Sequence, residues 1–149
     1  MVKFRFQDLK IWQFAIQIAD ELFDIADGLE QKRLYRFAEQ LRAAGMPISN
    51  NITEGSGSSS KKEFKQFLNM ARRSTYENAN ILILLEKRDL ISTENLNKLL
   101  DQLDHLCRQI TNFQTSYQFS LLKNEFQKPK KLEESLKNPP LSPFFKGGS

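Results

Sequence analysis

The stretch QLRAAGMPISNNITEG, residues 40–55, followed directly by SGSSSKKEF, residues 56–64, carries the most information about the fold. Small residues and amides stand where the interior of a helix usually carries leucine, and the pattern stops at Gly55. A serine-rich turn follows, and the lysine pair Lys61 and Lys62 opens a second periodic segment. The stretch therefore predicts a hairpin of two helices. Its corner is a candidate anion-binding site, because the start of a helix offers N–H groups and a positive dipole end.

Apolar residues recur at spacings of three and four along the hairpin and along one segment on each side of it, as in amphipathic helices. We expect helices over about Asp8 to Ala26, Gln31 to Asn51 or Glu54, Ser60 to Arg88, and Ser92 to an end between Thr115 and Lys123. No segment shows the alternation of a β-strand. With short connections, this pattern predicts an all-α fold, an antiparallel up-down-up-down four-helix bundle.

The first helix carries two apolar columns. One is a heptad seam that we expect to face the core, formed by Leu9, Trp12, Ile16, Ala19, Phe23 and Ala26. The other, a candidate surface for a partner subunit, is formed by Ile11, Ile18 and Ile25. In the second helix the predicted stripe is Leu34, Phe37, Ala38, Leu41, Ala44, Ile48 and Ile52.

Several residues are candidates for helix starts, ends and interruptions. Asp8 can cap the first helix and Gly28 can end it. Ser60 with Glu63 matches the capping box at the start of the third helix. Pro47 lies inside the second helical pattern, where it removes a backbone hydrogen bond, so we expect a kink or a break there.

Polar side chains of the hairpin are interpreted as ties between its two helices. A turn near Gly57 places Arg42 roughly opposite residues 73–77, which predicts a buried Arg42–Glu77 pair. Further hydrogen bonds between the helices are expected from Asn50, Asn51, Ser74 and Asn78. Satisfied polar groups of this kind fix the register of two helices more than they add stability.

Charge and composition predict one folded part and a tail. Residues 1–122 hold 16 Lys+Arg and 15 Asp+Glu, whereas residues 123–149 hold 6 and 3 and also contain four prolines. We expect a bundle over 1–122 and a disordered tail over 123–149. No apolar run approaches the roughly 20 residues of a membrane span, and the start of the chain lacks the pattern of a secretory signal. A cytoplasmic protein is the simplest expectation.

The residues that most often carry catalysis are scarce. His105 and Cys107 are the only histidine and cysteine, and residues two apart on a helix point in different directions. No metal site, cofactor site or catalytic residue is predicted, and the turn lacks the nucleotide-binding pattern G-x-x-x-x-G-K-[ST]. The carboxylates are interpreted as caps and ion-pair partners. The sequence therefore favours a protein without enzymatic activity.

A positive cluster at the start of the third helix is the candidate functional site. Residues 61–73 contain one carboxylate, Glu63, and five cations, namely Lys61, Lys62, Lys65, Arg72 and Arg73. Helical spacing puts Lys61, Lys65 and Arg72 on one side, flanked by the other two. Such a cluster can hold phosphates of RNA or DNA. A solvated helix face is the alternative interpretation. Phe64 and Phe67 belong to the core stripe, so base stacking is not predicted.

FQDLKIWQFA near the start and QLRAAGMPISNNITEGSGSSSKKEFKQFLNMARRSTYEN in the hairpin resemble the four-helix-bundle proteins encoded in intervening sequences of bacterial 23S ribosomal RNA genes. The resemblance covers about three-quarters of the chain, from Phe6 to Phe113. Family members commonly read S-I-x-N-N-I-A-E-G, where this chain has Pro47 for serine and Thr53 for alanine. The first departure bears on the local geometry of the helix.

The resemblance implies a ring-like homo-oligomer, typically a pentamer, and no catalytic residues. The family is similar to the accessory proteins of diversity-generating retroelements, which associate with a reverse transcriptase and carry a basic surface. We therefore expect an oligomeric accessory protein associated with RNA or DNA. The alternative is a protein-interaction module, for example a reverse-transcriptase accessory subunit, that binds no nucleic acid directly.

Overall fold

The computed structural model describes residues 1–126, with side chains as far as Tyr117. A 3₁₀ helix, η1 (Arg5–Asp8), precedes four α-helices, α1 (Lys10–Gln31), α2 (Tyr35–Gly57), α3 (Lys61–Lys87) and α4 (Thr93–Phe126). No strand occurs among the described residues, so the all-α class is confirmed. In that part of the chain, no helix combines the length and apolar character that crossing a lipid bilayer requires.

The chain divides into two compact units, Met1–Thr115 and Ser116–Ser149. The first holds η1, α1, α2, α3 and α4 up to Thr115. Of the second, only the end of α4 is described. Residues 127–149, most of the predicted tail, lie outside the described residues, so the division at residue 122 stays a prediction. The helix continues to Phe126, beyond the latest end that we expect from the sequence.

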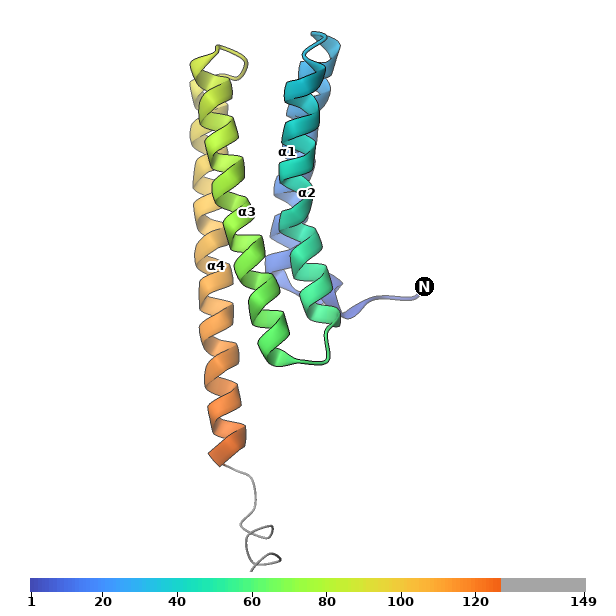
Figure 1. The fold of residues 1–149 in the computed structure, drawn as a ribbon, viewed down its shortest axis with the longest axis vertical. Coiled ribbons are helices and arrows are strands. Elements are labelled where there is room, and N and C mark those ends of the chain that lie inside the picture. The colour runs from blue at the N-terminus through green and yellow to red at the C-terminus, as the bar shows by residue number, and fades with distance from the viewer. Residues whose placement is uncertain (127–149) are drawn as a thin grey trace, which may run out of the picture. The chain divides into compact units, whose positions relative to one another are not determined.

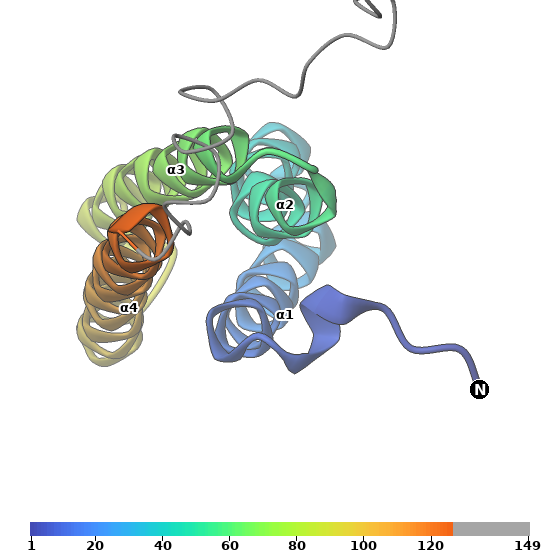
Figure 2. The same cartoon turned by 90° about the horizontal axis from the view of Figure 1, so that it is seen from below.

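Consecutive helices of the first unit run in opposite directions. The α1–α2 and α3–α4 connections lie at one end and the α2–α3 turn at the other (Figure 1). Seen along the helices, α1, α2, α3 and α4 follow one another around the unit (Figure 2). Between its first and last helices, Gln102 Nε2 donates to Glu21 Oε1 at 3.0 Å. The arrangement is that of an up-down-up-down bundle.

The buried face of α1 differs from the predicted one. Ile11 and Ile18, which we expect on a partner surface, are buried in the core, and Ile25 is half-buried. In the predicted seam, Ile16 is exposed and Trp12 and Phe23 are half-buried. The core face of α1 therefore combines Ala19 and Ala26 of the predicted seam with Ile11 and Ile18 of the other column, so the prediction that the seam alone faces inward was wrong. The buried residues of α1 are Ile11, Ala15, Ile18, Ala19, Leu22, Ala26 and Leu29.

The ends of α1 also differ from prediction. Leu9 precedes the helix and no side chain caps it, while Asp8 belongs to η1. Gly28 lies inside α1, so it does not end the helix. The end is a Schellman motif, in which Arg33 has a left-handed φ of 62° and the Leu34 N–H donates to Leu29 O at 2.9 Å.

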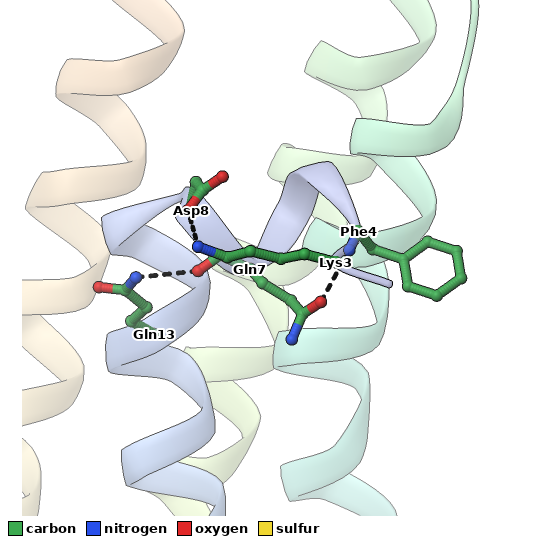
Figure 3. Close-up of polar contacts among 5 residues, drawn as sticks. All are labelled: Lys3, Phe4, Gln7, Asp8 and Gln13. Atoms are coloured by element: carbon green, nitrogen blue, oxygen red, sulfur yellow. Dashed lines mark hydrogen bonds and ion pairs between the residues drawn. The ribbon is translucent and has the colours of Figure 1, made fainter. Parts of the chain in front are cut away.

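Local hydrogen bonds hold the N-terminal turn beside α1 (Figure 3). The Phe4 N–H donates to Gln7 Oε1 at 2.7 Å, and Gln13 Nε2 of α1 donates to Gln7 O at 2.9 Å. Asp8 pairs with Lys3 at 2.5 Å instead of capping α1. Arg5 of the same turn donates to the carbonyl of Ser56 near the end of α2. This turn therefore joins the start of α1 to the end of α2.

α2 runs through Pro47 without a break. Of the two alternatives that we expect at Pro47, a kink or a break, the break into two helices around Gly45 to Pro47 was wrong, although proline in a helix interior costs about 3 kcal/mol. Asn51 lies one turn after Pro47, and its Nδ2 donates to Pro47 O at 2.7 Å. The predicted residues Ala38, Leu41, Ala44, Ile48 and Ile52 are all buried, while Leu34 and Phe37 are half-buried.

The small residues of α2 allow close contact with the helices on both sides. A Cβ atom at Gly45 would lie 3.3 Å from Leu22 Cδ1 of α1. A Cβ atom at Gly55 would lie 2.7 Å from Phe64 Cδ2 and from Phe67 Cβ of α3. Real Cβ contacts are almost never that short, so the α2–α3 distance at this level depends on a glycine. These contacts explain why glycine, and not a larger residue, stands at these two positions of α2.

α4 starts where the sequence predicts. Ser92 Oγ accepts from the Asn95 N–H at 3.1 Å, and Glu94 lies in the first turn. In α4 up to Tyr117, the buried residues are Leu96, Leu99, Leu103, Leu106 and Ile110, at the spacings of three and four that an amphipathic helix shows. Phe113 is half-buried, with its ring edge-on to Phe64 of α3 at a centroid distance of 5.6 Å.

We predict that Gly55→Ala destabilises the protein by about 1–2 kcal/mol. The new methyl group must displace Phe64 or the backbone near Phe67, and overpacking typically costs about 1–3 kcal/mol. The gain in helix propensity offsets only about 0.5–1 kcal/mol of this. Urea denaturation at a fixed protein concentration measures the change.

Gly28→Ala is the matched control. Nothing lies within 4 Å of a Cβ atom at Gly28. The same substitution in an open helical position should stabilise the protein by about 0.5–1 kcal/mol. Equal effects at Gly28 and Gly55 would contradict the close packing of α2 on α3.

Candidate nucleic-acid interface

Serine side chains shape the turn between α2 and α3. Ser58 Oγ donates to Gly55 O at 2.7 Å, which satisfies a carbonyl at the end of α2. Ser60 Oγ accepts from the Glu63 N–H at 3.3 Å, so Ser60 is the predicted N-cap of α3. The Phe64 N–H is also used, because it donates to Ser60 O at 3.0 Å. The bond of Phe64 is the first regular bond of the helix, so of the free amides at the start of α3 it is that of Glu63 that the cap occupies.

The five predicted cations lie along the first turns of α3. Lys62, Lys65 and Arg73 are exposed, while Lys61 and Arg72 are half-buried. Lys61 and Arg72 are eleven residues apart, which is about 16 Å along a helix. The structure thus puts all five on one element, and any contact with phosphate must come mainly from the three exposed side chains.

Arg73 faces a polar groove between α2 and α3. Its lining residues come from both helices and enclose about 420 Å³, namely Asn51, Met70, Arg73, Ser74 and Glu77. Glu77 is one helical turn beyond Arg73, and a carboxylate at that spacing offsets part of the positive charge. Lys62 and Lys65 lie farther from Glu77 along the helix than Arg73 does, so the carboxylate of Glu77 offsets their charge less.

The predicted ties of the hairpin are only partly present. Asn78 is completely buried, and its Nδ2 donates to Ala44 O of α2 at 2.6 Å. Asn51 and Ser74 bond carbonyls of their own helices, and Asn50 is exposed on α2. Asn78 is thus the one predicted amide for which the structure gives a bond between α2 and α3.

The predicted Arg42–Glu77 pair was wrong. Arg42 Nη2 contacts Asp27 Oδ1 at 2.5 Å and Glu30 Oε2 at 2.6 Å, both on α1. The hydrogen bonds that Arg42 donates to the carboxylates of Asp27 and Glu30 raise the pKa of Arg42 above its ordinary value. Arg42 therefore ties α2 to α1, on the side of α2 away from the basic cluster.

The sequence of residues 7–112 matches the family model described as 23S rRNA-intervening sequence protein. The chain belongs to this family. The family's description and the resemblance seen in the hairpin agree, and the matched residues include both α2 and α3. No protein of curated function matches the sequence significantly.

A crystal structure at 1.70 Å shares the fold of this family member. It is a protein of unknown function from the S23 ribosomal protein family of Bacteroides thetaiotaomicron. The two chains are 18% identical, with a TM-score of 0.66 over 70% of this chain and 97% of the other. Neither this description nor that of the family names an enzymatic activity.

His105 and Cys107 have separate surroundings in this family member. The exposed His105 ring meets Phe14 of α1 edge-on at 5.4 Å. Cys107 Sγ lies 2.6 Å from Thr75 Oγ1 of α3. Within residues whose side chains are described, no group of three His, Cys, Asp or Glu residues could hold a metal ion. Both residues thus contact side chains of neighbouring helices.

Sequence reasoning missed one aromatic residue on the basic face. Tyr76 of α3 is 64% exposed. It lies four residues after Arg72 and three after Arg73, so the three side chains share one side of the helix. The spacing is visible in the sequence, but the prediction considered only Phe64 and Phe67. Of these two rings, which we expect in the core, Phe64 is buried and Phe67 is half-buried.

We predict that Ser60→Ala destabilises the protein by about 1 kcal/mol, because the Glu63 N–H loses its acceptor. Chemical denaturation measures this change. Ser59→Ala is the control, since Ser59 is an exposed neighbour in the same turn. If both variants unfold at the same denaturant concentration as the parent, Ser60 is not the cap that stabilises α3.

Proposed function

We propose that this protein is a non-enzymatic accessory protein that binds RNA or DNA through the basic side of α3. The supporting observation is the row of Lys61, Lys62, Lys65, Arg72 and Arg73 along one helix, three of them exposed. Glu63 is the only carboxylate within residues 61–73. The family's description ties its members to ribosomal RNA genes, which supports an RNA-related role.

The expected binding is electrostatic and independent of base sequence. Each phosphate that a lysine or arginine neutralises releases bound counterions, so affinity falls steeply as salt rises. A cluster of three exposed cations gives weak binding when it acts alone. Several copies in one assembly would raise the apparent affinity, because later contacts become intramolecular. The proposal therefore includes a homo-oligomer, for which a pentamer is the expectation.

The surface proposed for self-association is the outer groove of α1 and α2. It encloses about 730 Å³, and its apolar lining includes Phe6, Trp12, Ile16, Phe23 and Met46. Ile16 and Met46 are exposed on neighbouring helices. This groove takes the place of the Ile11, Ile18 and Ile25 column, whose first two members are buried. Contiguous apolar surface of this kind often marks an interface between proteins.

The second candidate is a protein-interaction module without a nucleic-acid ligand. The same apolar groove favours it, since it offers a surface for a different protein, such as the reverse transcriptase suggested by the family resemblance. In that case the lysines of α3 serve solubility. A salt titration separates the two candidates, because the interaction module forms no nucleic-acid complex even at low salt.

We predict that reversing the three exposed cations, Lys62→Glu, Lys65→Glu and Arg73→Glu together, abolishes binding to RNA and DNA at low salt. The slope of log affinity against log salt measures lost phosphate contacts, at about 0.7 per contact for a single strand and about 0.9 for B-DNA. Fluorescence anisotropy with a labelled oligonucleotide gives both affinity and slope.

A charge-matched variant controls for the change in net charge. Lys10 is exposed on α1, Lys32 in the connection from α1 to α2, and Arg36 on α2. Their reversal to Glu should lower affinity far less than reversal on α3. Unchanged binding after reversal on α3, or equal losses in the two variants, would overturn the basic face as the binding surface.

We also predict that Ile16→Glu shifts the protein toward monomers, because a charge in the apolar groove must be desolvated when a second copy covers it. Ile83→Glu is the matched control, since both isoleucines are 40% exposed but Ile83 lies on α3. Sedimentation or light scattering measures the mass. An assembly that survives Ile16→Glu would contradict this placement of the interface.

A further inference from the structure

We propose that the basic face of α3 takes single-stranded nucleic acid, with an unpaired base stacked on Tyr76 beside the groove between α3 and α4. This inference rests on the proposed function and names the substrate class of the same site. Single-strand binding proteins combine cations that follow the backbone with aromatic rings on which bases stack. The structure holds both features on one side of one helix.

Tyr76 lies where a strand bound to the cations of α3 can reach it. Tyr76 is 64% exposed, although burying an aromatic side chain is favourable. Tyr76 is eleven residues after Lys65, close to three full helical turns, so the two side chains lie in one column. Arg72 lies between them on that column, four residues before Tyr76. A strand that follows the cations along α3 therefore reaches Tyr76.

The groove beside Tyr76 has an apolar lining. It encloses about 210 Å³ between α3 and α4, and its apolar lining includes Ala79, Leu100 and Leu103. The polar atoms of Thr75 and Cys107, which also line it, already contact each other at 2.6 Å. This lining therefore suits the flat apolar face of a base better than it suits a phosphate.

Charge gives the orientation of the strand. Asp104 lies on the α4 side of the groove, and its carboxylate pairs with Arg108 one turn further along α4. A carboxylate repels phosphates, so the backbone should follow Lys65 and Arg72 on α3 while the base turns toward α4. Asp104 can also accept a hydrogen bond from the amino group of a base.

A duplex would use only half of this surface. Its phosphates can reach the lysines, but its bases are paired and stacked on one another. Tyr76 would then add nothing to affinity, whereas stacking by one free base contributes about 1–3 kcal/mol. The two substrate classes therefore differ in how they respond to loss of the Tyr76 ring.

The test uses Tyr76→Ala in the full chain, with a labelled cytidine oligonucleotide and a duplex of equal length as probes. We expect a loss of about 5- to 150-fold for the single strand, which is the stacking contribution, and less than about 2-fold for the duplex. Tyr76→Phe should keep the affinity of the parent. Tyr35→Ala is the matched control, because Tyr35 is 56% exposed at the start of α2.

A second variant tests the groove itself. Ala79→Leu keeps Tyr76 but fills the space beside it, so it should also weaken the single strand and leave the duplex unchanged. Salt-dependent binding that is insensitive to Tyr76→Ala, or weakened equally for both probes, would overturn the single-strand inference while the proposed function stands. No salt-dependent binding of either probe would overturn the proposed function itself.

Discussion

The short distance from α2 to its neighbours is the constraint on which the rest of the first unit depends. At Gly55 only a hydrogen atom fits against Phe64 and Phe67, and at Gly45 a methyl group would crowd Leu22. The bond from Asn78 to Ala44 O, buried between α2 and α3, then fixes how far the helices slide along each other. Close contact and fixed register together decide which side of α3 is covered by α2 and which side is left for the basic residues.

The sequence was most informative where one physical signal acts alone. An N-cap needs only a short polar side chain before a helix, and the predicted cap Ser60 was confirmed. It was least informative where two apolar columns compete, as in α1. Both columns have helical spacing, and only the positions of α2 and α4 decide that Ile11 and Ile18 face the core. The predicted partner of Arg42 was wrong because its actual partners lie on α1, which the hairpin pattern does not include.

The ends of α1 and α3 show a signal that the prediction overlooked. Residues 29–34 read LEQKRL and residues 85–90 read LEKRDL. In both, the last leucine N–H donates to the first leucine carbonyl at 2.9 Å. The left-handed residue is Arg33 in one and Asp89 in the other, not the glycine that sequence reasoning seeks. An apolar pair five residues apart is typical of the Schellman motif, so in this chain the paired leucines predict the helix ends better than glycine does.

The candidate site follows from the same division of α3 into covered and open sides. Thr75 is buried and contacts Cys107 of α4, while its neighbour Tyr76 is exposed. The contact that holds α4 against α3 thus lies beside the groove, and the next residue is the aromatic ring at its edge. The lysines needed no packing information, since charge and spacing are visible in the sequence. Tyr76 did need it, because an aromatic residue in a helical pattern is more often buried, and only the register of α3 against α2 and α4 shows that this ring faces outward.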